Sequence, residues 1–492
     1  MKDNKNNSNK LHLSMMFHSL GIPLTGEGVA MLLCLIPSLH YGDGMAWHIG
    51  LAGLVTLAVG LLLLFLLPRK EVNDSAGRRT SYVIVTLIWV VMALFGTLPF
   101  LLSGVRSVTD ALFESVSGLT STGATVFADV ESLPPSLLLW RSMTEWLGGF
   151  GIILLVLAVV PSLGLNKYSL YTAEASGADN TGKTTTSMRT MVRRTLTVYV
   201  SLTVVFVVAM LLSGMTLWEA VNLTFTNIST GGFSIYSDSV ARFTPVQQYL
   251  LAAAMFLGGI NFTLIYNLFT LKWNKIKHKL DQFGFYVLLA VTGTAFVVAV
   301  LHLHDGLGFG DSPRLGVVQT MSVLTTTGSV VDDTNLWWTP VVFLFLVLSL
   351  CGGMAGSTTG GVKVMRVLIL LRNVRHTLTS RLHPHAYNPV RLNGSPVSND
   401  IITNVMVIFV VFVVTMMVGF VSLLLCGVDA TEAVGAVFGC ITSYGPGLGD
   451  CGGFGSYAAF PMVAKWICSL LMLLGRLECL TVFILFMPGF WK

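Results

Sequence analysis

The sequence predicts an all-α polytopic membrane protein with four parallel helix, pore-loop, helix repeats around a central pore and two extra N-terminal transmembrane helices. Only 11% of the 492 residues are charged and the mean hydropathy is +0.75, whereas an ordinary soluble domain is about a quarter charged. Apolar runs long enough to span a bilayer recur along the chain. A glycine turn also returns about every hundred residues, which indicates an internal repeat.

Ten apolar runs are long enough to cross, because a transmembrane helix needs about 20 apolar residues. They are residues 14–40, 46–67, 81–104, 136–163, 195–215, 245–271, 283–304, 339–371, 401–427 and 459–488. Four intervening segments are too short and too polar to cross, and we expect half-helices there: 108–119, 216–227, 313–325 and 430–441. The first two runs form an N-terminal extension within residues 1–80.

The charge distribution predicts the orientation. With the N-terminus in the cytoplasm, 23 of the 29 Lys and Arg residues lie on the cytoplasmic side, as the positive-inside rule requires. Both termini are then cytoplasmic, and the four half-helices enter from outside. Acidic residues flank them, including Asp110, Glu114, Asp129 and Glu131, and would concentrate cations at the outer mouth. Ordinary loop solubility explains any single one of these acids equally well.

Each half-helix ends in a hydroxyl-rich turn with a glycine. The turns are TSTGAT (120–125), ISTGGF (228–233), TTTGSV (325–330) and TSYGPG (442–447). Gly123, Gly231, Gly328 and Gly445 are 108, 97 and 117 residues apart. This period divides the rest of the chain into repeats at 81–191, 192–280, 281–397 and 398–492.

Irregular backbone at membrane depth is tolerated only where it is buried in protein or lines a water-filled cavity. We therefore expect the four turns to meet around one axis. Glycine permits backbone conformations in which consecutive carbonyls point inward and replace the hydration shell of a cation, and the C-terminal ends of the half-helices also favour positive charge. The alternative is that glycine and threonine only terminate re-entrant helices.

The eighth run cannot hold a straight helix, because glycines interrupt it together with small hydroxyl residues. The residues concerned are Gly352, Gly353, Gly356, Ser357, Thr358, Thr359, Gly360 and Gly361. A flexible packing kink is the alternative to a functional role for this stretch.

Arg476 lies deep in the last run, where a charge costs several kcal/mol unless it faces water or a partner. Glu478 or carbonyls of the glycine-rich stretch are candidate partners, and a structural ion pair away from the pore is the alternative. Glu145 is an intramembrane acid without an assigned role.

The sequence gives little support for a metal site, a disulfide framework or an enzyme active site. The paired histidines His302/His304 and His383/His385 lack further ligands at a useful spacing, so no transition-metal site is predicted. The seven cysteines mostly lie in apolar runs, and an odd count argues against a full disulfide framework; a Cys440 to Cys451 bridge is not expected. No His/Asp/Glu constellation suggests an enzyme, and no nucleic acid partner is expected.

Several stretches carry a family resemblance. They are TDALFESVSGLTSTGAT (109–125), WRSMTEWLGGFGI (140–152), NISTGGFS (227–234), GGMAGSTTGGVKVMR (352–366), GPGLG (445–449) and LLGRLECLTVFILFMPGFWK (473–492). With these, the chain resembles the Trk/Ktr/HKT superfamily of potassium transporters, and specifically its bacterial TrkH branch. The first two spans resemble the extra N-terminal pair of that branch.

The resemblance implies a potassium filter made of the four glycines and the residues before each. These are Thr120, Ser121, Thr122, Gly123, Ile228, Ser229, Thr230, Gly231, Thr325, Thr326, Thr327, Gly328, Thr442, Ser443, Tyr444 and Gly445. Glycine rather than serine at Gly123 points toward potassium over sodium. Tyr444 departs from the threonine of the other repeats, so the fourth wall is the least regular.

The resemblance also implies that the stretch from Gly352 to Gly361 is an intramembrane gating loop, that Arg476 is the pore arginine, and that Asn261 is a polar position of the second repeat. It implies potassium as the transported ion, the bacterial inner membrane as the location, a homodimer, and a cytosolic ring of TrkA-type nucleotide-binding regulatory subunits. Attraction of anionic lipid to the basic cytoplasmic segments is the simpler reading of those segments. A proton- or sodium-coupled secondary transporter remains the alternative function.

Overall fold

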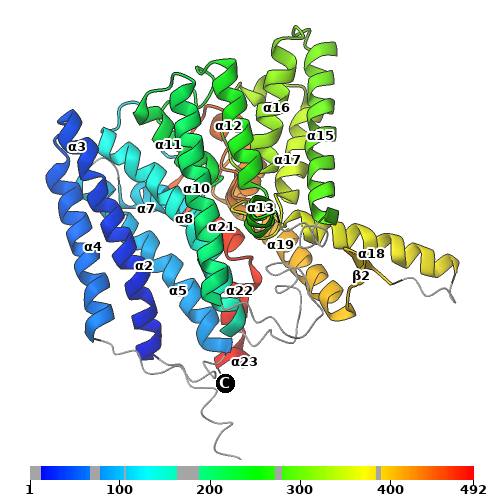
Figure 1. Ribbon diagram of the computed structural model, residues 1–492, viewed down its shortest axis with the longest axis horizontal. Coiled ribbons are helices and arrows are strands. Elements are labelled where there is room, and N and C mark those ends of the chain that lie inside the picture. The colour runs from blue at the N-terminus through cyan, green and yellow to red at the C-terminus, as the bar shows by residue number, and fades with distance from the viewer. Residues whose placement is uncertain are drawn as a thin grey trace, which may run out of the picture.

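The chain folds as a bundle of long helices in the computed structural model, which describes residues 13–66, 78–104, 107–162, 188–271, 280–383 and 389–491. Within these residues the strands are one antiparallel pair, β1 (Arg391–Leu392) and β2 (Ser395–Pro396). Most long helices run in a similar direction, whereas α18 (Val364–Leu382) runs across them and projects from the bundle (Figure 1). The all-α membrane fold that the sequence predicts is confirmed.

Two helices form the N-terminal extension: α2 (Leu13–Leu33), continued by α3 (Leu35–Tyr41), and α4 (Ala46–Leu66). The two helices pack closely because a glycine of each one lies against the main chain of the other. A Cβ on Gly28 would lie 2.6 Å from the Leu57 nitrogen, and one on Gly60 would lie 2.6 Å from the Thr25 nitrogen. Small residues at such contacts let membrane helices approach each other.

Four units of long helix, short helix, glycine turn and second helix follow. They are α5 (Arg78–Gly96), α6 (Leu98–Leu102), α7 (Val108–Leu119) and α8 (Pro135–Ser162); α10 (Met188–Leu212), α11 (Leu217–Ile228), α12 (Pro245–Gly258) and α13 (Phe262–Phe269); α15 (Leu280–Leu303), α16 (Asp311–Leu324), η3 (Thr334–Leu336), α17 (Thr339–Cys351) and α18; and α19 (Asn399–Leu425), α20 (Ala430–Ile441), η4 (Gly449–Cys451), α21 (Met462–Arg476), α22 (Leu480–Phe483), η5 (Ile484–Phe486) and α23 (Pro488–Trp491). Buried apolar side chains form one large cluster that joins the N-terminal pair to the first and fourth units and another that joins the second and third.

Three of the ten predicted spans are broken by a long non-helical segment or a sharp bend. The run 339–371 ends as a helix at Cys351 and resumes at Val364, as its glycines indicated. Helices α12 and α13 are bent by 103°, and α21 and the α22–η5 segment by 102°, which the hydropathy of 245–271 and 459–488 did not reveal. Asn261 accounts for the first bend, because its side chain accepts the N–H of Leu264 and starts a new helix. At the second bend, Glu478 and Cys479 have positive φ.

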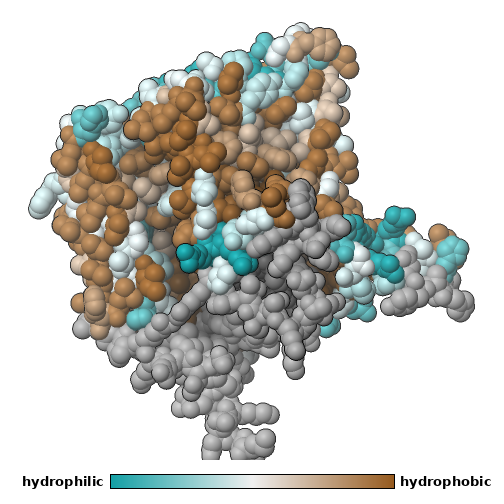
Figure 2. All heavy atoms as spheres, viewed as in Figure 1, coloured by the Kyte–Doolittle hydropathy of each residue, from teal (hydrophilic) through white to brown (hydrophobic). Residues whose placement is uncertain are grey.

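The outer surface is apolar over the long helices. Figure 2 shows hydrophobic residues over the middle of the visible face and hydrophilic ones toward its upper edge. Exposed side chains of this kind include Leu54, Val204, Val291 and Val410, which is expected of helices that face lipid. The basic segments at 69–79, 167–194 and 272–279, on which the predicted orientation depends, lie largely outside the described residues.

Asp43 fastens the N-terminal extension to the first unit. Its carboxylate accepts the N–H and hydroxyl of Ser136, at the start of α8, at 3.1 and 2.5 Å. It also accepts the Ser38 hydroxyl at 2.5 Å and the Met45 N–H at 2.9 Å. Partial burial raises the pKa of Asp43, but these hydrogen bonds outweigh it and hold the pKa below its ordinary value. The carboxylate is therefore stabilised in the folded state.

We expect Asp43→Ala to lower the free energy of unfolding by about 1 kcal/mol, because four donors lose their acceptor at a half-buried site. A carboxyl with a lowered folded-state pKa adds stability above its unfolded-state pKa of about 3.9 and loses it as the pH falls through the folded-state value. Thermal unfolding in detergent as a function of pH measures this difference, which should vanish in acid. Asp129→Ala is the control, since Asp129 is exposed and its carboxylate accepts only the nearby Glu131 N–H. An equal effect there would contradict the prediction.

Candidate functional site

Four short helices, α7, α11, α16 and α20, present their C-terminal ends to a common region. Three of them begin with a side-chain cap: Ser107 accepts the Asp110 N–H, Thr216 and Glu219 form a capping box, and Asp429 accepts the Thr431 N–H. Their C-cap residues are Thr120, Ser229, Thr325 and Thr442. From each cap a four-residue segment continues, and we call these segments the glycine turns: 120–123, 229–232, 325–328 and 442–445.

The glycine turns share one backbone conformation. The residue after each cap has a positive φ: Ser121 (51°), Thr230 (54°), Thr326 (52°) and Ser443 (56°). The fourth residue of each turn is a glycine with positive φ: Gly123 (78°), Gly232 (85°), Gly328 (83°) and Gly445 (92°). L-residues rarely adopt the second of these conformations, so the sequence needs glycine at the end of each turn.

In the second repeat, the register inferred from sequence is off by one residue. The counterpart of Gly123 is Gly232, not Gly231, and Ile228 is the last residue of α11 rather than part of the turn. The sequence STGG offers two glycines, and only the helix end shows which one takes the positive φ. Gly231 therefore occupies the position of Thr122, Thr327 and Tyr444.

The glycine turns form a closed ring. The final glycine of each turn lies against the next repeat. A Cβ built on that glycine would come nearer than 3.0 Å to a carbonyl oxygen of the next turn, that of the residue just before its own final glycine. The four pairs are Gly123 with Gly231, Gly232 with Thr327, Gly328 with Tyr444, and Gly445 with Thr122. Since the fourth pair returns to the first repeat, the turns encircle one axis, as expected from the sequence.

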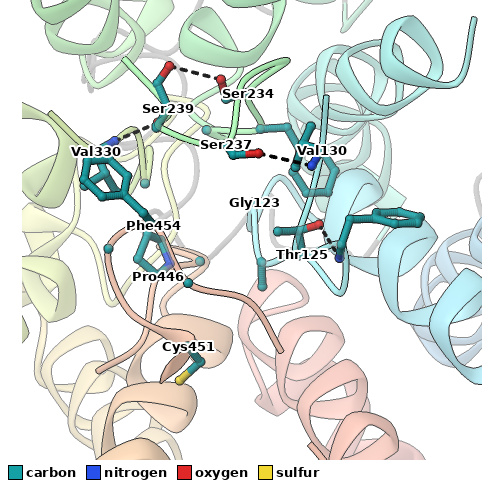
Figure 3. A pocket seen from close by; sticks show the side chains of 18 of the residues that line it. Gly123, Thr125, Val130, Ser234, Ser237, Ser239, Val330, Pro446, Cys451 and Phe454 are labelled. Atoms are coloured by element: carbon teal, nitrogen blue, oxygen red, sulfur yellow. Dashed lines mark hydrogen bonds between the residues drawn. The ribbon is translucent and has the colours of Figure 1, made fainter. Parts of the chain in front are cut away.

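A cavity lies at one end of this ring and is lined by all four final glycines, Gly123, Gly232, Gly328 and Gly445. Figure 3 shows the segments beyond the turns around it, with Ser237 bonded to Val130 and Ser239 bonded to Val330. These two hydrogen bonds, at 3.3 and 3.0 Å, link the second repeat to the first and third. The cavity thus leads from the surface loops to the ring.

A buried ion pair supports the wall between the first and second repeats. The Arg141 Nε donates to Glu114 at 2.7 Å, with both side chains at most 1% exposed. Arg141 also donates to the Ser234 carbonyl at 2.9 Å, and Glu114 accepts the Val126 N–H at 3.1 Å. Glu114 was expected in an acidic outer mouth, but the structure buries it. Sequence reasoning missed the pair, although two opposite charges at membrane depth were a usable signal.

Gln319 plays the corresponding part in the third repeat. Its carbonyl oxygen accepts the Val331 N–H at 3.2 Å, so its NH₂ group faces the Tyr444 hydroxyl, which accepts at 3.3 Å. The Tyr444 ring therefore points away from the axis toward α16. The fourth repeat is also linked to the first, because the Tyr457 hydroxyl donates to the Gly445 carbonyl at 2.9 Å and its N–H to the Thr125 carbonyl at 2.8 Å.

The non-helical segment 352–363, which we call the glycine loop, contacts the ring on the side opposite the cavity. The Thr358 hydroxyl lies 3.1 Å from the Ile228 carbonyl and 3.2 Å from the Gly258 carbonyl. The Gly360 N–H donates to the Thr326 hydroxyl at 2.7 Å, and a Cβ on Gly360 would collide with the Thr442 carbonyl. The loop therefore touches the ends of three of the four short helices.

The loop is held in place by the bend between α12 and α13. The Met354 N–H donates to the Gly259 carbonyl at 2.9 Å, and the Phe262 N–H to the Gly356 carbonyl at 3.2 Å. Asn261 donates to the Ala355 carbonyl at 2.5 Å. Asn261 thus both starts α13 and anchors the loop.

Arg476, at the end of α21, is 4% exposed and reaches the glycine loop. It donates to the Thr358 carbonyl at 2.7 Å, and to the Ser121 hydroxyl and Gly148 carbonyl at 3.3 Å each. Of the two candidate partners, the loop carbonyl is the one found. Glu478 instead pairs with Arg366 at 2.7 Å.

The site offers hydroxyl and carbonyl oxygens rather than nucleophiles or metal ligands. All seven cysteines are free, so Cys440 and Cys451 form no bridge. In the part of the chain that the structure describes, no group of three or more His, Cys, Asp or Glu side chains is placed to hold a metal ion. Converging neutral oxygens are the ligands with which proteins replace the hydration shell of an alkali cation.

Comparison with known proteins agrees with this chemistry. A family model described as TrkH, cation transport protein, matches residues 48–491. The Trk system potassium uptake protein TrkH of Halomonas elongata is 32% identical over 98% of this chain and 100% of its own length. The protein of that name from Vibrio parahaemolyticus is 33% identical over 97% of this chain and 100% of its own length. A crystal structure of the potassium transporter TrkH from Vibrio parahaemolyticus superposes with a TM-score of 0.88, covering 98% of this chain and 100% of that chain at 30% identity. The chain therefore belongs to the TrkH family of cation transport proteins.

Proposed function

We propose that this protein takes up potassium across the bacterial inner membrane through a selectivity filter formed by the glycine turns. The closed ring of carbonyl oxygens at Thr122, Gly231, Thr327 and Tyr444 carries the proposal. Oxygens that encircle an axis can replace the water around a cation. Similar proteins named for potassium uptake support the choice of ion. The chain has the role of a transporter and no enzymatic activity.

We propose that the filter comprises all sixteen residues of the four glycine turns, with Gly232 at the end of the second turn and Ile228 just before it. Cations enter from the cavity beside Gly123 and Gly445, which places the cavity on the outer side. The C-terminal ends of α7, α11, α16 and α20 face the ring, and their dipoles favour a positive charge. The proposed repeats are 81–191, 192–280, 281–397 and 398–492, after the extension at 1–80.

The glycine loop is the proposed gate. It lies across the path below the ring, and Arg476 holds its Thr358 carbonyl while placing a positive charge beside it. A cation leaving the filter would meet both the loop and this charge. Movement of the loop away from Thr326 and Ile228 opens the path in this proposal.

The remaining partners belong to the same proposal. The protein assembles as a homodimer, has both termini in the cytoplasm, contacts membrane lipids and docks a cytosolic TrkA-type nucleotide-binding ring. Of the basic segments that would meet that ring or anionic lipid, 69–79, 167–194 and 272–279 lie largely outside the described residues, whereas α18 with Arg372, Arg375 and Arg381 is described. Potassium is the transported ion rather than a resident cofactor.

Uptake of radioactive rubidium into potassium-loaded liposomes that contain the purified protein tests the function. Potassium is expected to compete with rubidium, sodium to compete weakly, and a pH gradient to have no effect. A strict requirement for a proton or sodium gradient would instead favour the coupled secondary transporter. Equal competition by sodium would overturn the potassium assignment.

We expect loss of the Gln319 to Tyr444 hydrogen bond to weaken selectivity. Tyr444→Phe should reduce the preference for potassium over sodium about fivefold, which corresponds to about 1 kcal/mol for one buried hydrogen bond. Gln319→Leu should reduce it by at least as much, because it also removes the acceptor of the Val331 N–H. The double variant should lose no more than Gln319→Leu alone, because that change already removes the hydrogen bond that Tyr444→Phe removes. Rubidium uptake with competing ions measures this, and additive losses would show that the two residues act separately.

A further inference from the structure

The residue before the last glycine of each turn contributes its carbonyl to the ring, and in three repeats its side chain is anchored. The Thr122 hydroxyl lies 2.7 Å from that of Thr120, and the Thr327 hydroxyl lies 2.7 Å from that of Thr325. Tyr444 is held by Gln319, as described above. The second repeat has Gly231 at this position and no side chain to anchor.

The carboxylate of Glu145 fills the vacant space behind Gly231. A Cβ on Gly231 would lie 2.5 Å from Glu145 Oε2 and 2.7 Å from Oε1. Both oxygens accept the N–H of Phe233, at 3.1 and 3.2 Å. Phe233 directly follows Gly232, so the carboxylate fixes the backbone on the far side of the glycine. The Glu145 side chain comes from α8 of the first repeat and is fully buried.

Two glycines bring α8 this close to the ring. A Cβ on Gly148 would collide with the Leu119 carbonyl, and one on Gly149 would lie 2.8 Å from the Ser229 Cβ. The main-chain carbonyl of Glu145 also accepts the Ser121 hydroxyl at 3.3 Å. Residue 145 therefore contacts the first turn through its main chain and the second through its side chain.

We propose that Glu145 is a positioning residue of the second filter wall, which replaces the side chain missing at Gly231 and sets the place of the Gly231 carbonyl through the Phe233 N–H. This inference rests on the proposed function of the ring. The role requires an acceptor oxygen of the right reach, which glutamine also supplies, and a small residue at position 231.

The first test compares Glu145→Gln with Glu145→Leu in full-length protein in liposomes, using rubidium uptake with potassium or sodium as competitor. We expect the glutamine variant to keep the potassium preference within about twofold and the leucine variant to lose fivefold or more. Glu27→Leu is the matched control. Glu27 is also a buried carboxylate at membrane depth, but it belongs to α2 of the N-terminal extension and lies against Gly96 of α5. The potassium preference of this variant should therefore not change. An unchanged potassium preference in Glu145→Leu overturns the inference. A Glu145→Gln variant that loses as much preference as Glu145→Leu also overturns it, because the negative charge and not the acceptor oxygen would then be required.

The second test removes the steric conflict. Gly231→Ala should impair selectivity strongly, because its Cβ meets the Glu145 carboxylate. In Gly231→Ala/Glu145→Ala the conflict is gone, so the double variant should be no worse than Glu145→Ala alone; additive losses overturn the inference. If the wild type carries no potassium-preferring flux, the proposed function fails and this inference falls with it. If the wild type does and the variants match it, only the inference fails.

Discussion

Gly123→Ser is expected to abolish most of the preference for potassium over sodium. Gly123 has a φ of 78°, and a Cβ there would press on the Gly231 carbonyl of the next repeat. A strained side chain of this kind costs on the order of 1–3 kcal/mol. The ring can relieve it only by moving that carbonyl, so we expect at least a tenfold loss of preference. Rubidium uptake with sodium or potassium as competitor measures the loss.

Gly214→Ser provides the matched control for this prediction. Gly214 also has a positive φ, 93°, but a Cβ there would meet nothing within 4 Å. The substitution therefore introduces similar backbone strain without touching the ring. Unchanged ion competition in Gly123→Ser, or an equal change in Gly214→Ser, would refute the assignment of the glycine turns as the filter.

Deletion of residues 352–361 is expected to raise basal flux at least tenfold. The loop lies against the side of the ring opposite the cavity and Arg476 holds it there, so its removal should unblock the proposed path. The two ends left by the deletion lie near each other, because the Val362 N–H donates to the Leu350 carbonyl at 2.9 Å. Rubidium uptake without any regulatory partner measures the basal rate.

Point variants separate gating from damage to the fold. Thr358→Val keeps the shape of the side chain but removes the hydroxyl that bonds to Ile228 and Gly258, and should raise basal flux several-fold. Thr415→Val is the control, since its buried hydroxyl donates to Val411 of its own helix and is otherwise bonded to Cys479 rather than to the glycine loop. Basal flux equal to that of the wild type in both the deletion and Thr358→Val would show that the loop does not gate.

The helical architecture was predictable because its signals are local. Hydropathy over about 20 residues marks a span regardless of what surrounds it, and a hydroxyl-glycine turn after a short segment marks a re-entrant helix. The interruption of the eighth run could be read in the same way from its glycines. Arg476 stood out because a charge at membrane depth requires an explanation.

The second-repeat register, the two sharp bends and the supports of the ring depend on contacts between distant parts of the chain. Gly231 and Gly232 are locally equivalent, and the carboxylate of Glu145 from another repeat is what occupies the space behind the first of them. Likewise, the sequence does not show which partners Glu114 and Gln319 meet. The packing of α8 brings Arg141 to Glu114, and the fourth turn brings Tyr444 to Gln319. Local pattern therefore specified which segments turn at membrane depth. The packing of four such segments against one another specified which atoms form the ring, because each carbonyl takes its place from the glycine and the side chains of its neighbours.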